Sequence, residues 1–447
     1  MTYLSAVNNN QQKIGLVTSI SIVVSNMVGT GVFTSLGFQV TEIKSVMILL
    51  MLWLTGGVIA LCGALSYGEL ASAMPRSGGE YNFLSGIYHP VLGFLAGWVS
   101  VLVGFSAPAA LAAIAMAKYA GRIIHIQNLS ILAIGLIIFL SCIHSYQIKF
   151  GGRFQKTVTL LKILVILIFV TAGFTIPHTT GFSMNPMSSD WKQLVSPAYA
   201  VSLIFVSYAF SGWNASVYII NEVRKPGKNV PISLISSTLL VTVLYFLLNF
   251  IFLYSTPLAD LEGNIEIGSI SAGHIFGTQG GKIMASIISL LLISSVSAMI
   301  WIGPRVSMVM GEDYRIFRFL GKKNRYSVPV RAIWIQALLS IVMILTSTFE
   351  RVLIYTGFLL NFFTLLSVIG VFILRRKSIT PYGGYRMPGY PVTPLIFIAL
   401  NTWTILYVML ERPVESLIGF LTVISGIIVY RVNKKFLNKN LTKSLSN

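Results

Sequence analysis

Charged residues are scarce in this chain of 447 residues. Asp, Glu, Lys and Arg make up 10% of the sequence and hydrophobic residues 55%, whereas an ordinary soluble domain carries about 25% charged residues. A soluble globular protein is therefore excluded. A disordered basic chain is excluded as well, because disorder requires low hydrophobicity. The class that remains is an all-α polytopic membrane protein, in which about 20 apolar residues cross the bilayer once.

Acidic residues are the scarcest charged groups: 13 Asp and Glu stand against 32 Lys and Arg, which gives a formal charge of +19. Such an excess indicates nucleic-acid binding only where it gathers on a water-exposed surface. Here the basic residues lie between apolar segments, and the basic run from Arg315 to Arg331 is most simply a loop beside anionic lipid. We expect membrane lipid as a partner and no nucleic acid.

Cysteine and histidine are also rare. The two cysteines, Cys62 and Cys142, lie within apolar segments, which excludes a disulfide framework and predicts a buried thiol at each position. The five histidines include no pair at i, i+4. The sequence therefore predicts no metal site, no cofactor and no catalytic residue, so a membrane-embedded enzyme is disfavoured.

Long apolar segments fill most of the chain and leave little room for a water-soluble domain. The gaps between them near 177–193, 257–282, 312–329 and 375–393 have the length of loops. The pattern predicts twelve transmembrane helices, at about 14–41, 45–73, 83–117, 128–148, 157–176, 194–221, 232–256, 283–309, 330–349, 352–374, 394–410 and 414–432.

The basic residues sort unevenly when successive loops are assigned to alternate sides of the membrane. The side that holds the N-terminus receives 25 of the 32 Lys and Arg, and the opposite side receives the other seven. Loops rich in Lys and Arg stay on the cytoplasmic side. The asymmetry supports twelve spans and predicts a multi-pass protein of the plasma (bacterial inner) membrane with both termini in the cytoplasm.

Two of the predicted spans contain interruptions. Gly29-Thr30-Gly31 lies in the middle of the first span and Ser211-Gly212 lies at a comparable depth in the sixth. Non-helical backbone at that depth is tolerated only where it is buried in protein or lines a cavity. The glycines alone would also fit close helix packing. Matching interruptions five spans apart favour a transporter with one shared cavity.

Corresponding breaks in two halves predict a 5+5 inverted repeat with broken helices 1 and 6. Residues 1–180 would form the first five-helix repeat and residues 181–376 the second, inverted one. Residues 377–447 would add two helices and a basic cytoplasmic tail. Half-helix ends expose unpaired N–H groups, which favour a carboxylate, and unpaired C=O groups, which favour an ammonium. One cavity that offers both suits a zwitterion such as an amino acid.

At these residues the sequence resembles the amino acid–polyamine–organocation (APC) superfamily, and within it the L-type amino-acid transporters and their bacterial relatives. The resemblance extends from span 1 to span 11. The matching stretches are Val28–Phe33, Ser66–Leu70, Pro75–Tyr81, Tyr208–Asn214, Asn221–Pro226, Asn229–Pro231 and Tyr385–Pro391.

The resemblance implies a substrate site at the two breaks. The substrate carboxylate would meet the backbone N–H groups of Gly29, Thr30 and Gly31, with the Thr30 hydroxyl nearby. The ammonium would meet the carbonyls of Met27, Tyr208 and Ser211, and Tyr208 would act as an aromatic lid over the substrate. Without the break, a packed aromatic residue would be the simpler interpretation of Tyr208.

Lys162 lies several residues inside an apolar segment, where an ammonium costs about 2.5–3.5 kcal/mol. It could snorkel to the cytoplasmic face. The resemblance instead implies that it replaces the second sodium ion of sodium-coupled relatives. It would then contact carbonyls such as those of Val24 or Ser25 and the hydroxyls of Ser294 and Ser297. The sequence leaves open whether the ammonium stays charged, which suits exchange, or titrates, which suits proton symport.

Two glutamates, Glu69 and Glu80, are expected to be structural, with bonds from loop backbone or from arginines such as Arg76 or Arg153. Because neither break contains an acidic residue, neutral amino acids are the predicted substrates. Ser106, Ala107 and Ser211 would leave space beside the substrate side chain.

The loop at 118–127 has no cysteine, whereas eukaryotic L-type relatives use one there to bond a heavy chain, so no disulfide-linked heavy chain is expected. Two alternatives stay open. One is a proton-coupled carrier of cationic amino acids or polyamines, and the other is a receptor that binds amino acids without transporting them.

Overall fold

The computed structural model describes residues 13–124, 127–146, 151–177, 182–184, 190–326, 328–377 and 384–445. The side chains of 151–155 and 435–445 also fall outside the description. Within the described ranges the chain forms helices and no strand, apart from one bridge between Ile14 and Val223. The polar N-terminus to Gln12, His125 and His178 lie outside these ranges.

The helices follow one another along the whole described chain. In order they are α1 (Leu16–Met27), α2 (Thr30–Glu42), α3 (Val46–Ala73), α4 (Glu80–Ile87), α5 (Pro90–Val99), the π-helix η1 (Ser100–Gly104), α6 (Ser106–Gly121), α7 (Leu129–Tyr146), α8 (Gly151–Gly173), α9 (Asp190–Gln193), α10 (Pro197–Phe210), α11 (Ala215–Tyr218), the short η2 (Ile220–Glu222), α12 (Pro226–Ser255), α13 (Leu258–Leu261), α14 (Ile267–Asp313), the short η3 (Arg315–Phe317), α15 (Val330–Thr346), α16 (Phe349–Arg376), α17 (Val392–Glu411) and α18 (Pro413–Leu445).

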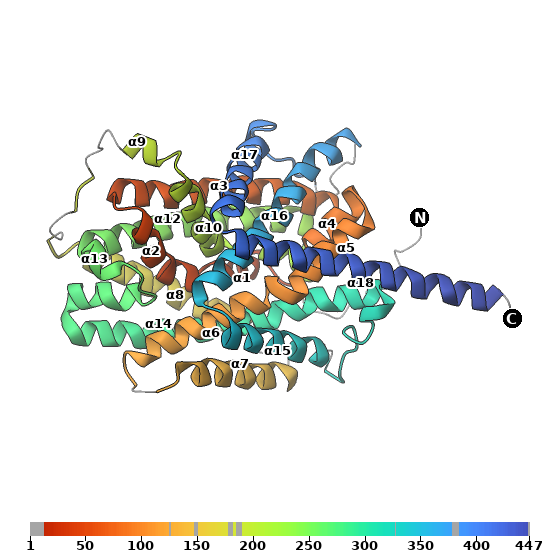
Figure 1. Ribbon diagram of the computed structural model, residues 1–447, viewed down its shortest axis with the longest axis horizontal. Coiled ribbons are helices and arrows are strands. Elements are labelled where there is room, and N and C mark those ends of the chain that lie inside the picture. The colour runs from red at the N-terminus through yellow and green to blue at the C-terminus, as the bar shows by residue number, and fades with distance from the viewer. Residues whose placement is uncertain are drawn as a thin grey trace.

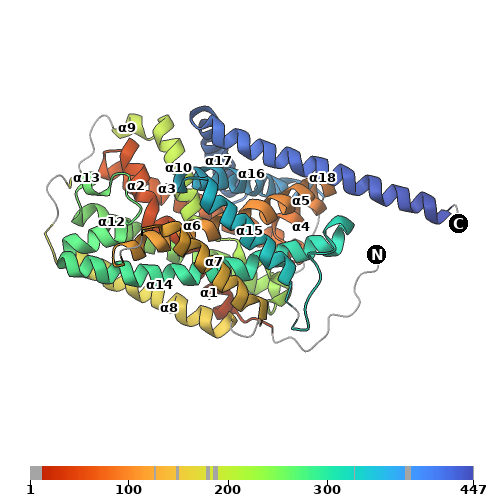
Figure 2. The ribbon, with the colours of Figure 1, turned by 60° about the horizontal axis from the view of Figure 1, so that its bottom comes forward.

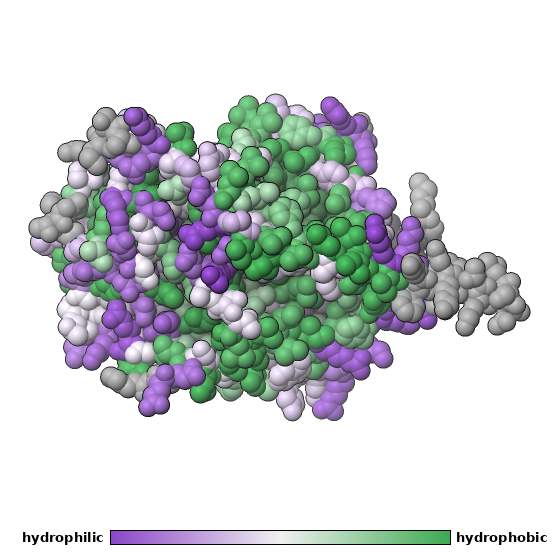
Figure 3. Space-filling model, in the orientation of Figure 1, coloured by the Kyte–Doolittle hydropathy of each residue, from purple (hydrophilic) through white to green (hydrophobic). Residues whose placement is uncertain are grey.

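Ten of the helical segments in the described ranges are long and apolar enough to cross a membrane, and α10 and α15 are shorter apolar helices. Together they match the twelve predicted spans. The helices pack as one bundle, beyond which α18 projects (Figures 1 and 2). The visible surface of the molecule is apolar across the middle and hydrophilic towards the two ends of the long axis (Figure 3), as an all-α polytopic membrane protein requires.

Local sequence fixes several helix starts. The side chains of Ser196 and Thr348 accept hydrogen bonds from backbone N–H groups at the starts of α10 and α16. Proline occupies the first turn of α5, α10 and α12. A backbone N–H in the first turn has no intrahelical acceptor, so proline, which lacks this group, costs the helix no hydrogen bond there. These signals place the helix starts independently of the tertiary packing.

The predicted interruptions of spans 1 and 6 are both present. In span 1 one helix ends at Met27 and the next begins at Thr30. In span 6 the helix ends at Phe210, before the short α11. The two breaks pack directly against each other. A Cβ atom on Gly31 would lie 2.3 Å from Ala209 Cα, and one on Gly212 (φ 96°) would lie 2.9 Å from the backbone of Asn26. Only glycine permits this approach.

Three expectations about the fold are wrong in detail. The 257–282 segment is largely helical, because α14 begins at Ile267 and folds back at Gly277 (φ 75°, ψ 179°). The third predicted span is divided into α4, α5, η1 and α6. Cys62 is buried as expected, but Cys142 is exposed. A helix that is apolar all round does not reveal from its sequence which face meets lipid and which meets protein.

Candidate functional site

The two breaks enclose a small cavity of about 20 Å³. It brings together all six residues predicted to bind substrate. Its lining comprises Asn26, Met27, Gly29, Thr30, Gly31, Pro108, Ala112, Tyr208, Ala209, Ser211, Ser295 and Met299.

The N-terminus of α2 provides hydrogen-bond donors at this cavity. Thr30 and Gly31 occupy its first turn, where backbone N–H groups lack intrahelical acceptors and the helix dipole is positive. Gly29 N–H is already used, since it donates to the Met27 carbonyl at 2.7 Å. The hydroxyl groups of Thr30 and Tyr208 bond each other at 3.1 Å, so the predicted lid residue joins one break to the other.

The carbonyls predicted to receive an ammonium are partly occupied. Tyr245, on α12, donates its hydroxyl to the Met27 carbonyl at 2.5 Å and to the Ala209 carbonyl at 3.1 Å. The Tyr208 carbonyl accepts the Ser211 N–H at 2.9 Å, which leaves one of its two lone pairs. Tyr245 escaped the sequence analysis, because one tyrosine in an apolar span carries no pattern that distinguishes it from a packed aromatic residue.

Lys162 is 1% exposed and lies beside the same cavity. Its ammonium donates to the Val28 carbonyl at 2.7 Å, the Ser295 hydroxyl at 2.9 Å and the Ser25 carbonyl at 3.3 Å. Snorkelling to the membrane face is therefore wrong. The contact to Ser25 agrees with the sequence analysis, and the ammonium bonds Val28 rather than Val24.

The α14 partners predicted for Lys162 are wrong. Ser294 donates to the Leu291 carbonyl of its own helix, and Ser297 bonds His144 at 2.8 Å. Successive helical residues point about 100° apart, so of these three serines only Ser295 faces the lysine. A serine-rich helix indicates that a hydroxyl is available but not which one faces inward.

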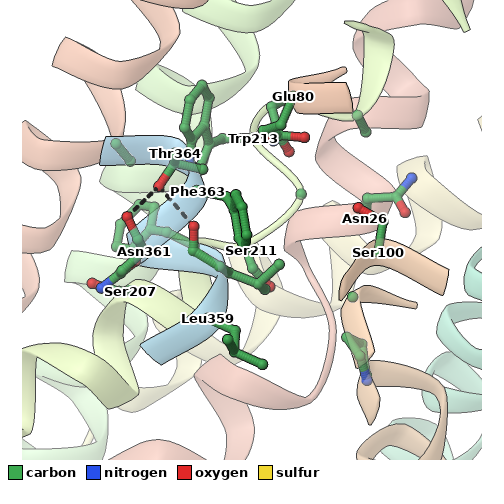
Figure 4. A pocket seen from close by; sticks show the side chains of 18 of the residues that line it. Asn26, Glu80, Ser100, Ser207, Ser211, Trp213, Leu359, Asn361, Phe363 and Thr364 are labelled. Atoms are coloured by element: carbon green, nitrogen blue, oxygen red, sulfur yellow. Dashed lines mark hydrogen bonds between the residues drawn. The ribbon is translucent and has the colours of Figure 1, made fainter. Parts of the chain in front are cut away.

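A larger cavity of about 80 Å³ adjoins the first and shares Asn26, Pro108, Ser211 and Met299 with it. Ser207, Asn361 and Thr364 lie on one side, and Asn26 and Ser100 lie on the other (Figure 4). The π-helix η1 supplies Ser100 and Gly104. Ser211 lines this cavity as expected, but Ser106 and Ala107 do not; their neighbours Gly104, Phe105 and Pro108 do.

Glu80 does not have the partners predicted for it. It lines the larger cavity and accepts hydrogen bonds from the Tyr67 hydroxyl (2.8 Å), the Asn214 amide (2.7 Å) and the Tyr218 hydroxyl (2.6 Å). It forms no ion pair with any described basic residue.

Glu69 has the predicted kind of partners. Arg375 donates to both of its carboxylate oxygens at 2.8 Å, and the Met387 N–H donates at 2.9 Å. The arginine is Arg375 rather than Arg76, which instead pairs with Asp313 at 2.8 Å. Among the described residues, no three His, Cys, Asp or Glu side chains converge as a metal site.

A family model described as amino acid permease matches residues 14–432. The chain belongs to the amino acid permease family. The permease is 26% identical over 444 residues to the serine/threonine exchanger SteT of Bacillus subtilis, a match that covers 96% of this chain and 98% of that protein. It is 23% identical to the human b(0,+)-type amino acid transporter 1, over 94% of this chain and 87% of that protein.

A third relative is the mouse large neutral amino acids transporter small subunit 2, which is 24% identical over 94% of this chain and 80% of that protein. These similarities and the bundle of apolar helices identify the permease as an integral membrane protein of the APC superfamily that transports amino acids.

Proposed function

We propose that the permease exchanges neutral L-amino acids across the plasma membrane by sodium-independent alternating access, with both termini in the cytoplasm. The observation that carries the proposal is the small cavity between the two broken helices, which Met27, Gly29, Thr30, Gly31, Tyr208 and Ser211 all line. The uneven distribution of Lys and Arg supports the orientation.

In this proposal the substrate carboxylate binds at the N-terminus of α2, beside the Thr30 hydroxyl. Its ammonium binds near the end of α10, where the Tyr208 carbonyl keeps one lone pair and the Ser211 carbonyl is the next acceptor along the break. Because the Met27 carbonyl already accepts from Gly29 and Tyr245, its contribution to the ammonium requires that one of these bonds yields as substrate enters.

Lys162 supports independence from sodium. Its ammonium is bonded to two carbonyls of the first span and to a hydroxyl of α14. A second cation among the same oxygens would be repelled by this fixed charge. The lysine thus holds the first break against α8 and α14, the role that sodium plays in sodium-coupled relatives.

A second candidate is transport of cationic amino acids, which the acidic residue at the larger cavity favours. Glu80 is the one charged residue among those that line that cavity. Its two oxygens already accept three hydrogen bonds, so little acceptor capacity is left for a substrate ammonium or guanidinium. We therefore favour neutral substrates.

Uptake into proteoliposomes tests the proposal. The expected result is uptake of a labelled neutral amino acid that requires a neutral counter-substrate inside and is unchanged when sodium is replaced by potassium. Competition by all twenty amino acids identifies the substrate class. Dependence on sodium would refute the role of Lys162, and competition by lysine or arginine alone would favour the second candidate.

The same preparation tests three further elements of the proposal. Binding without flux would indicate a receptor, and uptake driven by a pH gradient without counter-substrate would indicate proton symport. Full exchange by the purified chain alone would agree with the absence of a disulfide-linked heavy chain. Alternating access by residues 1–180 and 181–376 as inverted repeats predicts that the site opens to each side in turn.

A further inference from the structure

Glu80 carries a buried charge that the proposed binding mode does not use. Its side chain is 4% exposed, and its carboxylate lies at the edge of the larger cavity beside Trp213 (Figure 4). All three donors to the carboxylate are neutral groups. An ionised carboxylate accepts hydrogen bonds only, so two hydroxyls and one amide are matched to that form.

The donors come from two other segments of the chain. Tyr67 lies on α3, whereas Asn214 and Tyr218 lie on the part of span 6 that follows its break. Glu80 itself is the first residue of α4. The carboxylate is therefore the point at which α3, α4 and the second half of the broken span are joined. Asn214 also donates to the Tyr218 hydroxyl at 3.2 Å, which links the two donors to each other.

The segment that presents Glu80 fits this junction closely. Gly78 and Gly79 precede it with φ angles of 119° and 59°, which L-residues with side chains rarely adopt. A Cβ atom on Gly79 would lie 2.4 Å from the ring of Tyr218. Tyr67 packs edge-on against Trp213, with ring centroids 4.7 Å apart. The glycine pair therefore brings α4 into direct contact with the half-span that the carboxylate holds.

The junction lies on the side of the molecule where span 6 ends. Beyond Tyr218 the chain reaches Arg224, whose N–H donates to the Ile14 carbonyl, so this side also holds the start of span 1. Ser211, which lines both cavities, precedes Asn214 by one turn of chain. The break that lines both cavities and the Asn214 donor therefore lie on one short stretch of span 6.

We propose that Glu80 is a positioning residue of the transport cycle, whose carboxylate holds the second half of span 6 against α3 and α4 and so keeps the cavity closed towards the side of Ile14. Opening to that side breaks the bonds from Asn214 and Tyr218, and water replaces them at the carboxylate. This inference rests on the proposed alternating access and adds the group that restrains one of its two openings.

Cysteine accessibility tests the restraint directly. Ser100 lines the cavity, and a Ser100→Cys variant in a Cys62→Ser, Cys142→Ser background carries one reactive thiol. A membrane-impermeant maleimide is applied from each side of the membrane in turn. We expect Glu80→Gln to raise the labelling rate from the Ile14 side by about tenfold, the factor for one lost charge-assisted hydrogen bond, and to lower it from the opposite side.

Three variants complete the accessibility test. Tyr218→Phe removes one charge-assisted bond to the carboxylate and should also raise labelling by about tenfold. Glu80→Asp keeps the charge and should return labelling towards that of the parent. Glu69→Gln is the matched control, because Glu69 is a buried glutamate outside both cavities, and it should leave labelling unchanged. Equal labelling of the parent, Glu80→Gln and Tyr218→Phe proteins would overturn the proposal.

Exchange kinetics give an independent readout. A larger population open to the Ile14 side lowers the fraction that binds substrate from the other side, so Glu80→Gln should raise KM there with a smaller change in maximal rate. A structural defect would instead lower the amount of active protein at constant KM, and that result would overturn the proposal. Failure of the wild-type protein to transport would refute the proposed function, whereas the labelling result would still test the restraint.

Discussion

The buried glutamates Glu69 and Glu80 lie on neighbouring segments of the chain and look alike in the sequence, yet their surroundings differ. Glu69 is neutralised by Arg375, which donates a hydrogen bond to each carboxylate oxygen. Neither Glu69 nor Arg375 lines a described cavity. Glu80 is held by an amide and two hydroxyls, has no counter-ion among the described residues and lines the larger cavity. The Glu69–Arg375 pair fixes α3 to α16, whereas Glu80 and its donors join α3, α4 and the second half of span 6 beside the break.

Lys162 follows the pattern of Glu80. Its ammonium is satisfied by two carbonyls and a hydroxyl and by no carboxylate of a described residue. An ion pair is costly to break inside a protein, so it suits a contact that persists throughout the cycle. Neutral partners can exchange for water or for one another at a lower cost, which suits a contact that must form and break. From this difference we propose that Glu69 is structural and that Glu80 and Lys162 are used in transport.

The largest effect should come from breaking the paired charge. Arg375→Leu leaves Glu69 buried without a counter-ion and should lower the free energy of unfolding by about 3 kcal/mol. Thermal melting of the purified protein in detergent measures this change. Adding Glu69→Gln to the same protein should recover most of the loss, because the unpaired charge is gone. Equal melting temperatures for the single and double variants would contradict the distinction.

Lys162→Ala should affect transport rather than folding. Removing the three hydrogen bonds of the ammonium should reduce uptake by about 100-fold, equivalent to about 2.7 kcal/mol. The melting temperature should change much less than in Arg375→Leu. Lys156→Ala is the matched control, because Lys156 is an exposed lysine on the same helix. Unchanged uptake by Lys162→Ala would class the lysine with the structural charges.

The contact between the two breaks provides the next prediction. In Gly31→Ala the added Cβ meets Ala209 at 2.3 Å, and overpacking of this kind costs about 1–3 kcal/mol. Substrate affinity should fall by about tenfold or more. Gly135→Ala is the control, since a Cβ at this position on α7 meets nothing within 4 Å. Competition for uptake measures both, and equal affinities would show that the breaks need not touch.

The smallest effect distinguishes neighbouring serines on α14. Ser295→Ala removes one hydrogen bond from the Lys162 ammonium and should reduce uptake by about fivefold. Ser294→Ala removes only a bond to the carbonyl of Leu291 in its own helix, so uptake should stay within about twofold of wild type. The reverse order would show that the lysine moves to Ser294 during the cycle.

Much of the fold could be predicted from the sequence because the bilayer imposes simple rules. Backbone groups in lipid must be satisfied within a helix, so apolar length alone indicated twelve spans. The Gly29-Thr30-Gly31 and Ser211-Gly212 interruptions were visible because each combines glycine with a small polar residue and the two lie five spans apart at a comparable depth. The helical course of 267–282 was missed, because a segment rich in glycine and serine resembles a loop until packing folds it back at Gly277.

The candidate site could be predicted in part. The residues of both breaks were found, since their departure from helix is a local property of the sequence. The contacts of Tyr245 and Ser295 were missed and the partners expected for Glu80 were wrong, because each contact joins residues far apart in the chain. Tyr245 reaches Met27, Ser295 reaches Lys162, and Glu80 reaches Asn214.

The amino-acid sequence alone predicted that this protein crosses the membrane many times, that spans 1 and 6 are broken and that one lysine lies within a span. These are properties of composition and local spacing, which a lipid environment converts directly into helices. The packing of the helices was needed to show which buried charges are paired and which line the cavity. A helix face acquires a partner only when another helix packs against it, and no local pattern in Glu69 or Glu80 specifies that neighbour.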